Sequence, residues 1–461
     1  MSDREQGCGL PGWKRTTLGK ALPIHYGKAR NEKYGTVRED TPVYGSSGRI
    51  DTFKRALTGR PSLIIGRKGT VGATYYCPEP CWPIDTVYFV EASAGEDLRF
   101  FKYLLDHLQL ARMDRSTAVP GLSRDDYNAT EVFIPELDQQ RLIVAEIEKQ
   151  FSRLDEAVAN LKRVKANLKR YKAAVLKAAV EGKLTEDWRK QHPNVQPASK
   201  LLERILAERR AKWCGRGKYK EPAKSDTSNL WFLPTGWVWT SPDQLSQVNA
   251  NAICAGPFGT IFKAKDFRPA GVPIIFLRHI APGRYLRHKP GFMHETKWKE
   301  LFKPYSVFGG ELLVTKLGEP PGVCAIYPEG IGPAMVTPDV IKMSVNSTAI
   351  LPKLMMHYLN SDIARRFATG AAFGTTRLRV TLPIFREMPV PLPPLAEQEQ
   401  IVAEVERRLS VIDELEATVE ANLTRADRLR QSILSQAFSG KLSSQQCYNQ
   451  DVTARFGRVN L

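Results

Sequence analysis

The chain contains one segment of about 50 residues twice, and this duplication limits the folds that it can adopt. Residues 135–184 align with residues 393–442 at a constant offset of 258 residues and without a gap. Both copies begin with Pro-x-Leu-x-x-Gln, continue with Ile-Val-Ala-Glu and end with Gly-Lys-Leu. Such self-similarity indicates a duplicated structural unit.

Each copy of the segment has the apolar spacing of a long helix. Apolar residues recur at intervals of three, four or seven, for example at Ile143, Ile147 and Phe151 and again at Ile401, Val405 and Leu409. Neither interior contains Pro or Gly, and Gly182 and Gly440 are suitable C-terminal stops. About 44 residues rising 1.5 Å each form a rod of roughly 65 Å.

A rod of this length cannot bury its apolar stripe alone, so it needs a partner helix. The chain already holds two equivalent helices, and we therefore predict that they pair with each other as an antiparallel coiled coil. The alternative is a stalk in which helices of two separate chains pair.

A weaker repeat precedes each helical segment. Leu-Pro-Gly-Trp at 10–13 and Leu-Pro-Thr-Gly-Trp at 233–237 open the two regions. Each region then has a β-branched run followed by a basic, glycine-containing loop, at 63–72 and at 312–318. Short runs of this kind, broken by Gly and Pro, predict strands joined by irregular loops.

The predicted fold class is therefore α+β, with two mixed α/β domains separated by two long antiparallel helices in a pseudo-twofold internal repeat. The expected order is described by six ranges. They are a first domain at 1–135, a helix at 136–184, a connector with a short helix and a linker at 185–229, a second domain at 230–392, a second helix at 393–442 and a disordered tail at 443–461.

The net charge of +18 favours a polyanionic partner. The excess is largest in the second domain region, where residues 230–393 carry 18 Lys and Arg against 10 Asp and Glu. No apolar run reaches the roughly 18 residues of a membrane-spanning helix, and we expect no membrane association. Seven cysteines without a paired pattern suggest reduced thiols and a cytoplasmic location.

Motifs for catalysis are missing from the sequence. It has no Gly-rich ATP-binding loop, no Phe-x-Gly-x-Gly cofactor loop and no Asn-Pro-Pro-aromatic run. Cys77 and Cys81 have no second pair to complete a metal site. Asp266 with Glu295 and Lys297 fits the acidic pair and lysine of a nuclease only loosely. We predict a binding protein with no catalytic residue, metal or cofactor of its own.

The glycine-containing loops are the candidate contacts to DNA. Glycine lets the backbone approach phosphates closely, while Arg and Lys supply charge or paired hydrogen bonds to bases. The candidates are Tyr44, Ser46, Ser47, Arg49, Arg67, Lys68, Thr70 and Arg124 in the first domain, and Phe258, Lys263, Arg278, Lys316, Thr375, Thr376, Arg377 and Arg379 in the second.

With these features the chain resembles the specificity subunit of type I restriction-modification enzymes. The resemblance rests on the starts and ends of the two helical segments, on Tyr-Gly-Ser-Ser-Gly at 44–48, on the stretch at 64–72 and on Trp-Pro-Ile-Asp-Thr at 82–86. In the second domain it rests on Gly-Pro-Phe-Gly at 256–259 and on the loop at 375–379.

The resemblance implies that each domain is a target-recognition domain that reads one half of a bipartite double-stranded DNA target. It implies that the helices separate the domains and dock two methyltransferase subunits, which use S-adenosylmethionine. A motor-endonuclease subunit would join for restriction, with Mg²⁺ and ATP also bound on partner subunits rather than on this chain.

Two other functions stay open at the level of sequence. One is a single-chain DNA-modifying enzyme with an unrecognised active site, which activity of the purified chain would support. The other is a coiled-coil scaffold that binds nucleic acid non-specifically, in which case duplex DNA would be bound without sequence preference.

Overall fold

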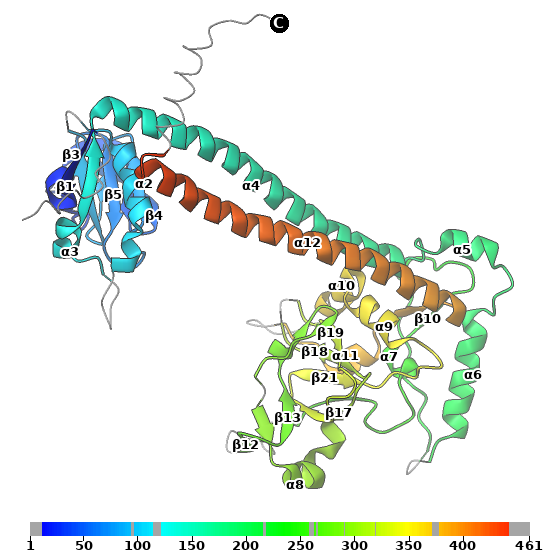
Figure 1. Cartoon of the computed structure of the whole chain (residues 1–461). Helices are drawn as coiled ribbons and strands as arrows, with labels where there is room; N and C mark the ends of the chain where they lie inside the picture. Colours follow the sequence, from blue (N-terminus) through cyan, green and yellow to red (C-terminus); the bar gives the residue numbers. More distant parts are fainter. Residues whose placement is uncertain are drawn as a thin grey trace, which may run out of the picture. The chain divides into compact units, whose positions relative to one another are not determined.

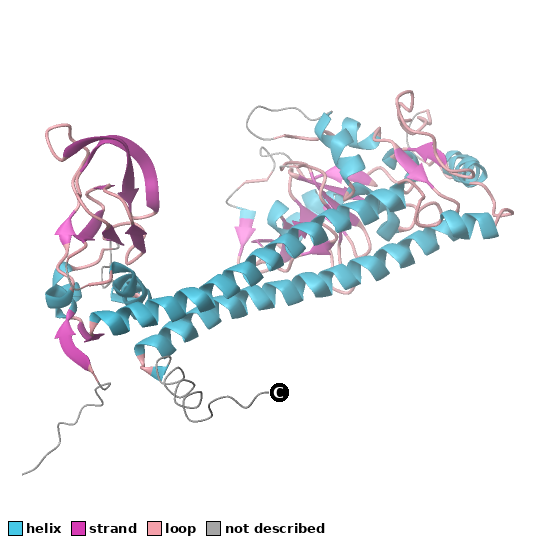
Figure 2. Ribbon diagram, turned by 90° about the horizontal axis from the view of Figure 1, so that it is seen from above, coloured by secondary structure: helices cyan, strands magenta, loops and turns pink. Residues whose placement is uncertain are grey.

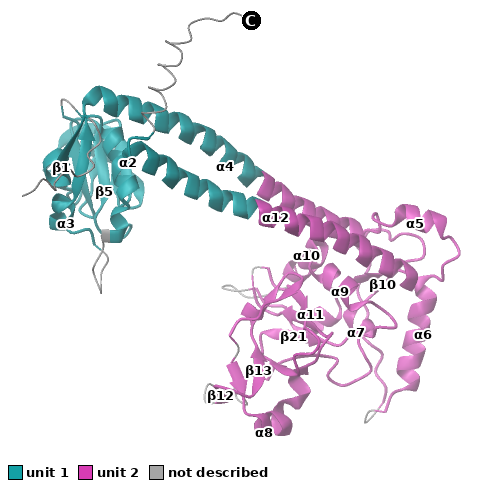
Figure 3. Ribbon diagram, viewed as in Figure 1, with its two compact units in different colours: residues 1–163, 419–461 teal, residues 164–418 magenta. Residues whose placement is uncertain are grey.

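The computed structural model of the chain describes residues 12–93, 96–113, 121–214, 218–257, 262–263, 266–289, 291–318, 320–370 and 378–441. The chain folds into two compact units (Figure 3). Unit 1 comprises residues 1–163 and 419–461, and unit 2 comprises residues 164–418. None of the described helices is long and apolar enough to cross a membrane.

Two helices of 44 residues each, α4 (Leu137–Val180) and α12 (Leu395–Phe438), contribute to both units. In unit 1 the start of α4 lies beside the end of α12, where Arg430 forms an ion pair with Asp155. In unit 2 the end of α4 lies beside the start of α12, where Lys172 Nζ lies 2.8 Å from Asp413 Oδ1. The helices are therefore antiparallel in each unit (Figures 1 and 2), as the repeat predicted.

The Gly-Lys-Leu ends stop the helices through a left-handed glycine. Gly182 has a φ of +73° and Gly440 a φ of +75°, a conformation that costs glycine little. The N–H of Lys183 then reaches back to the carbonyl of Ala178 at 2.8 Å, which satisfies one of the last free carbonyls of the helix.

A buried glutamine holds the start of each long helix in place. The Nε2 of Gln140 donates to the carbonyl of Pro135 at 3.0 Å, and its Oε1 accepts from the N–H of Asp97 at 3.2 Å. Gln398 makes the same pair of bonds, to the carbonyl of Pro393 at 3.1 Å and from the N–H of Leu351 at 2.9 Å. Asp97 and Leu351 are the N-cap residues of two helices that come earlier in the chain, α2 (Leu98–Leu108) and α9 (Pro352–Leu359). The repeated glutamine thus joins each long helix to a helix of its own domain.

Both units contain a four-stranded antiparallel sheet with the same strand order. In unit 1 the order is β2 (His25–Tyr26), β8 (Val87–Glu91), β5 (Ser62–Gly66) and β6 (Thr74–Cys77). In unit 2 it is β11 (Ile253–Ala255), β21 (Val340–Met343), β18 (Leu312–Thr315) and β19 (Cys324–Ile326).

A second sheet contains the same parallel strand pair in each unit but differs in size. Unit 1 has the order β4 (Gly48–Ala56), β3 (Thr36–Gly45) and β7 (Trp82–Pro83), with β3 and β7 parallel. Unit 2 has the order β12 (Phe267–Arg268), β16 (Gly291–Met293), β13 (Val272–Ile275), β20 (Ala334–Val336) and β17 (Ser306–Val307), with β13 and β20 parallel.

Two-stranded ladders connect each domain to its long helix. In unit 1, β1 (Trp13–Thr17) pairs with β9 (Glu131–Pro135), and in unit 2, β10 (Val238–Thr240) pairs with β22 (Val390–Leu392). A further hairpin joins β14 (Ile280–Ala281) to β15 (Arg284–Tyr285).

The shorter helices occupy matched places in the two units. Helices α1 (Leu18–Ala21) and α3 (Arg124–Ala129) of unit 1 correspond to α7 (Pro242–Leu245) and α11 (Leu382–Arg386) of unit 2. Unit 2 also contains α8 (Glu295–Lys297) and α10 (Asp362–Gly370).

The connector is more ordered than its sequence suggests. It contains α5 (Glu186–Gln191) and α6 (Ala198–Ala211), and the latter corresponds to the expected short helix. Residues within the expected linker hydrogen-bond to unit 2. The N–H of Ala223 donates to Asp243 at 2.8 Å, and the hydroxyl of Ser225 lies 3.0 Å from the carbonyl of Thr240. These two bonds fix the linker against the second domain.

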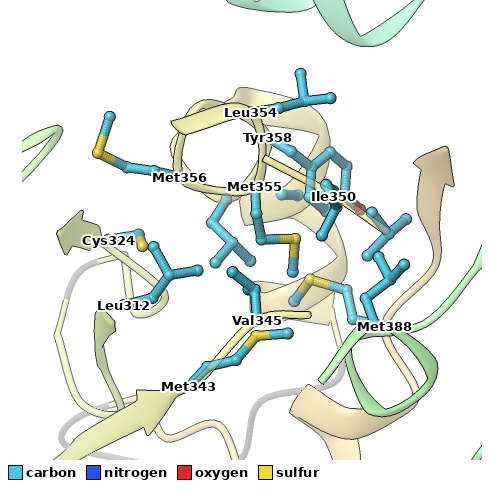
Figure 4. Packing of buried hydrophobic residues seen from close by; sticks show 14 of the residues in the cluster. Leu312, Cys324, Met343, Val345, Ile350, Leu354, Met355, Met356, Tyr358 and Met388 are labelled. Carbon is cyan, nitrogen blue, oxygen red and sulfur yellow. The ribbon is translucent and has the colours of Figure 1, made fainter. Parts of the chain in front are cut away.

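Each unit buries its own apolar core. In unit 2 the core gathers side chains from β18, β19, β21 and α9, including Leu312, Met343 and Met355 (Figure 4). In unit 1 the core joins α2 to the start of α4 and also takes in Leu434 and Ala437 from the end of α12. The first domain is therefore completed by the far end of the chain.

Candidate nucleic-acid interface

The basic loop after the third strand of the four-stranded sheet is built in the same way in both units. The loop between β5 and β6 is closed by a hydrogen bond from Gly72 N to Gly66 O at 2.8 Å. The loop between β18 and β19 is closed from Gly322 N to Thr315 O, also at 2.8 Å. The first residue of the loop in unit 1 is Arg67. The same place in unit 2 is taken by Lys316, so the two loops are structural counterparts.

Two other segments meet this loop at equivalent points. The N–H of Arg67 donates to the carbonyl of Thr86 at 3.0 Å, and the N–H of Lys316 donates to that of Asp339 at 2.8 Å. The carbonyl of Arg67 accepts from Leu122 at 2.9 Å, and that of Lys316 accepts from Val380 at 3.0 Å. The sequence-predicted loops are thus brought together in each unit.

In unit 1 a tyrosine that the sequence analysis missed lies between two predicted arginines. The guanidinium carbons of Arg67 and Arg124 each lie 5.4 Å from the ring centre of Tyr26. The Tyr88 ring meets that of Tyr26 edge-on, with their centres 5.0 Å apart. Burial and then a hydrogen bond with Tyr26 raise the pKa of Tyr88 to about 12. Cations over aromatic faces attract the ring electrons, so this cluster fixes both guanidinium groups.

The predicted serine hairpin lies beside the same loop. Tyr44 is the second-last residue of β3, Ser46 and Ser47 form the turn, and Arg49 is the second residue of β4. The Oγ of Ser46 lies 3.0 Å from the position that a Cβ on Gly69 would take. Lys68 and Thr70, on either side of Gly69, are exposed.

The two cysteines near this hairpin are buried thiols that interact with each other. Hydrogen bonding from Cys81 lowers the pKa of Cys77 to about 6, and both side chains are buried. Burial and then a hydrogen bond with Cys77 raise the pKa of Tyr44 to about 12. In the part of the chain that the structure describes, no three His, Cys, Asp or Glu side chains gather as metal ligands would.

In unit 2 the predicted cations differ in their exposure. Lys316 is only 5% exposed, whereas a residue that contacts DNA was expected to reach the surface. Burial and the nearby charge of Arg379 lower the pKa of its amine, while Asp339 opposes that shift. Arg379 is more exposed and lies 3.7 Å from the carboxylate of Asp339.

Arg278 lies near the same carboxylate. Its guanidinium carbon is 4.3 Å from the ring centre of Phe276. Arg278, Asp339 and Phe262 line a hollow of about 440 Å³. Lys263 follows Phe262 directly and is exposed. Arg278, Arg379 and Lys263 are therefore the described cations of unit 2 that reach its surface among those predicted.

Four predicted residues, Phe258, Thr375, Thr376 and Arg377, lie outside the described residues. Tyr26, Tyr88 and Asp339 also belong to the interface but were not predicted from the sequence. The signal available for Asp339 was the run Thr-Pro-Asp-Val at 337–340, which resembles Pro-Ile-Asp-Thr at 83–86, whereas nothing in the sequence distinguishes Tyr26 from other tyrosines.

The three residues of the nuclease-like spacing do not form one site. Lys297 pairs with Asp266, which is 6% exposed, but Glu295 is exposed and pairs with Lys299 at 2.7 Å. The second acidic residue therefore does not join the first.

A second feature recurs in both units, where the long helices meet the domain. A hollow of about 870 Å³ in unit 1 is lined by Glu148, Phe151 and Gln431 among others. A hollow of about 580 Å³ in unit 2 is lined by the repeat-equivalent residues Glu406, Leu409 and Ala173. The ion pairs of Asp155 and Asp413 described above lie at the wall of each. The two hollows are thus copies of one site.

Comparison with known proteins supports the resemblance found in the sequence. Residues 290–425 match the model of the type I restriction modification DNA specificity domain. The specificity subunit of the type I restriction enzyme EcoDI of Escherichia coli is 25% identical over 94% of this chain and 89% of its own length. That of EcoBI, also from Escherichia coli, is 25% identical over 83% of this chain and 74% of its own length.

Residues 290–425 therefore match a type I restriction modification DNA specificity domain, and most of the chain is similar to type I restriction enzyme specificity subunits. A specificity subunit is the recognition component of its system and not an enzyme, as the sequence analysis expected. A chain from a solved structure of a type I restriction-modification system has the same fold, with a TM-score of 0.59 and 16% identity over 94% of this chain and 99% of that chain. The fold class expected from the repeat is therefore confirmed for this chain.

Proposed function

We propose that this specificity subunit reads a bipartite target in double-stranded DNA, with one half of the target bound by each domain. The observation that carries the proposal is the duplicated interface. The loops that begin at Arg67 and at Lys316 follow equivalent strands and meet equivalent segments, and arginines lie at both interfaces, Arg67 and Arg124 in unit 1 and Arg278 and Arg379 in unit 2. Arginine is the side chain best suited to paired hydrogen bonds with guanine.

The antiparallel pairing of α4 and α12 supports two different half-sites. Antiparallel equivalent helices are related by a twofold axis, and twofold-related readers meet the duplex in the same way on opposite strands. The side chains at equivalent loop positions differ between the domains, so each domain should specify different bases. A spacer of fixed length would separate the two halves, and modified bases would fall one per strand.

A domain graft tests this proposal. Residues 230–392 are replaced by the corresponding domain of a relative, and the modified motifs in genomic DNA are determined before and after. We expect one half of the motif to change while the other half and the spacer stay the same. An uninterrupted motif, or a graft that alters both halves together, would refute it.

We further propose that two copies of a methyltransferase subunit dock on this chain, one in each of the matched hollows beside the long helices. A site that occurs twice in one chain suits two identical partners. S-adenosylmethionine would be bound by those partners, and Mg²⁺ and ATP by a motor-endonuclease subunit. A chromosomal DNA target also agrees with the cytoplasmic location expected from the cysteines.

A further inference from the structure

Tyr26 is the centre of the side-chain cluster in unit 1 and has no assigned role. Tyr26 is 47% exposed, although its ring contacts two guanidinium groups and the Tyr88 ring. The ring is therefore not a core residue, and its contacts restrain the two arginines. It removes much of the rotational freedom that the arginines would otherwise lose on binding.

Each arginine is also anchored to the backbone at one edge of its guanidinium group. Arg67 Nη2 donates to the carbonyl of Asp85 at 2.6 Å, and Arg124 Nη2 donates to that of Ile24 at 3.2 Å. The Nε of Arg67 is buried and has no hydrogen-bond partner among the described residues. These contacts hold the two planar groups against Tyr26 in defined positions before any ligand arrives.

The equivalent place in unit 2 has a different composition. Gly27 and Gly256 are counterparts, because a Cβ on either would lie 2.0 Å from a carbonyl oxygen of the equivalent neighbouring segment. The residue before each glycine is Tyr26 in unit 1 and Ala255 in unit 2. Arg67 corresponds to the buried Lys316. The N-cap residue of α3 corresponds to that of α11, so the residue equivalent to Arg124 is Leu382. The cluster is therefore confined to one of the two domains.

We infer that Tyr26 is a positioning residue for base recognition in the first half-site, where it holds Arg67 and Arg124 ready to bind guanine. This inference rests on the proposed reading of duplex DNA. A guanidinium group with its plane fixed can donate two hydrogen bonds to the O6 and N7 of guanine in the major groove. Tyr26 would therefore contribute to discrimination at guanine positions through the two arginines, without contacting a base itself.

The test uses the specificity subunit assembled with its methyltransferase subunits. The modified motif is first read from genomic DNA, and duplexes carrying each single-base change in that motif are then bound by the wild type and by Tyr26→Ala. We expect Tyr26→Ala to lose about tenfold discrimination at one or two guanine positions of one half-site. The other half-site and the spacer should be unaffected.

Three further variants make the test specific. Tyr26→Phe keeps the ring and should retain discrimination. Arg124→Lys keeps the charge but loses the planar donor group, and should lose discrimination at one of the guanine positions affected by Tyr26→Ala. Tyr34→Ala is the matched control, because Tyr34 is 50% exposed in the same unit and lies near Lys28 rather than the two arginines. It should leave every position unchanged.

The outcomes separate this inference from the function on which it rests. If no modified motif depends on the wild-type chain, the proposed function is wrong. If the motif exists but Tyr26→Ala discriminates as well as the wild type, only the role of Tyr26 is wrong. A uniform loss of affinity for all duplexes, or a melting temperature lowered equally in Tyr26→Ala and Tyr26→Phe, would show a role in folding or phosphate contact and would overturn the inference.

Discussion

Glu397 takes the position of the repeat that Gln139 occupies in the first copy, and its hydrogen bonds show how one buried side chain holds distant segments of unit 2 together. Glu397 is fully buried, accepts hydrogen bonds from Thr185 at 2.7 Å and from the indole N–H of Trp237 at 2.8 Å, and pairs with Arg189. An isolated buried carboxylate would be strongly destabilising, and these three partners offset that cost. Arg189 lies in the connector, far from Glu397 in sequence, so no local pattern could predict this site.

The predicted cations provide a test at the same scale. Lys68 is exposed, whereas Lys316 is buried. Lys68→Ala should lower the slope of log affinity against log salt by about one unit and weaken binding to all duplexes alike, because a phosphate contact releases about one counterion. Lys316→Ala should leave that slope unchanged.

Filter binding to duplex DNA over a range of salt concentrations measures both slopes. The double variant should behave like Lys68→Ala. A slope that falls as much for Lys316→Ala as for Lys68→Ala would show that Lys316 reaches the DNA after all.

Among the secondary-structure elements, the long helices were the most predictable. Their apolar period extends over 44 residues, and glycine stops both copies. The basic loops were also found, because a β-branched strand precedes each. The sheets were not, because strands of two to five residues such as β7 and β20 pair in parallel with partners distant in sequence. Two additional strands, β12 and β17, enlarge the second sheet of unit 2 without a distinct sequence signal.

The end of α4 offers a test at the level of an element. Gly182 has a φ of +73°, and a Cβ there would lie 2.6 Å from Pro234 Cγ. Gly330 has a φ of +77° but no atom within 4 Å of the same position. Gly330→Ala should therefore cost only the backbone strain of about 1–2 kcal/mol.

Gly182→Ala should cost a further 1–3 kcal/mol or so, because the added methyl group is also crowded. Thermal unfolding of the two variants beside the wild type measures the difference. Equal melting temperatures for the two variants would mean that Pro234 moves aside freely and that the stop is not tightly packed.

At the scale of the whole molecule, the duplicated hollows bear on how many partners one chain can hold. Gln431 and Ala173 are repeat equivalents, and each lines one hollow. Tryptophan at either position should block one copy of the methyltransferase subunit and leave the other bound. Native mass spectrometry of the assembled complex should then show one partner copy for Gln431→Trp, one for Ala173→Trp and none for the double variant.

The control for this experiment is the neighbouring Ala174, which is exposed and is not among the residues that line the hollow. Ala174→Trp should retain two partner copies. Two copies bound to the double variant would place the docking site elsewhere on the chain.

The order in which this chain is synthesised has a consequence for how it folds. The core of unit 1 includes Leu434 and Ala437, and the ring of Phe438 lies 5.4 Å from that of Phe100. Residues 164–418 must leave the ribosome between the two parts of that unit. At about 5–20 residues per second, this takes roughly 15–50 s. During that interval the first domain exposes the apolar surface that the end of α12 will cover, so a nascent chain stalled or terminated early would be a ready substrate for chaperones and proteases.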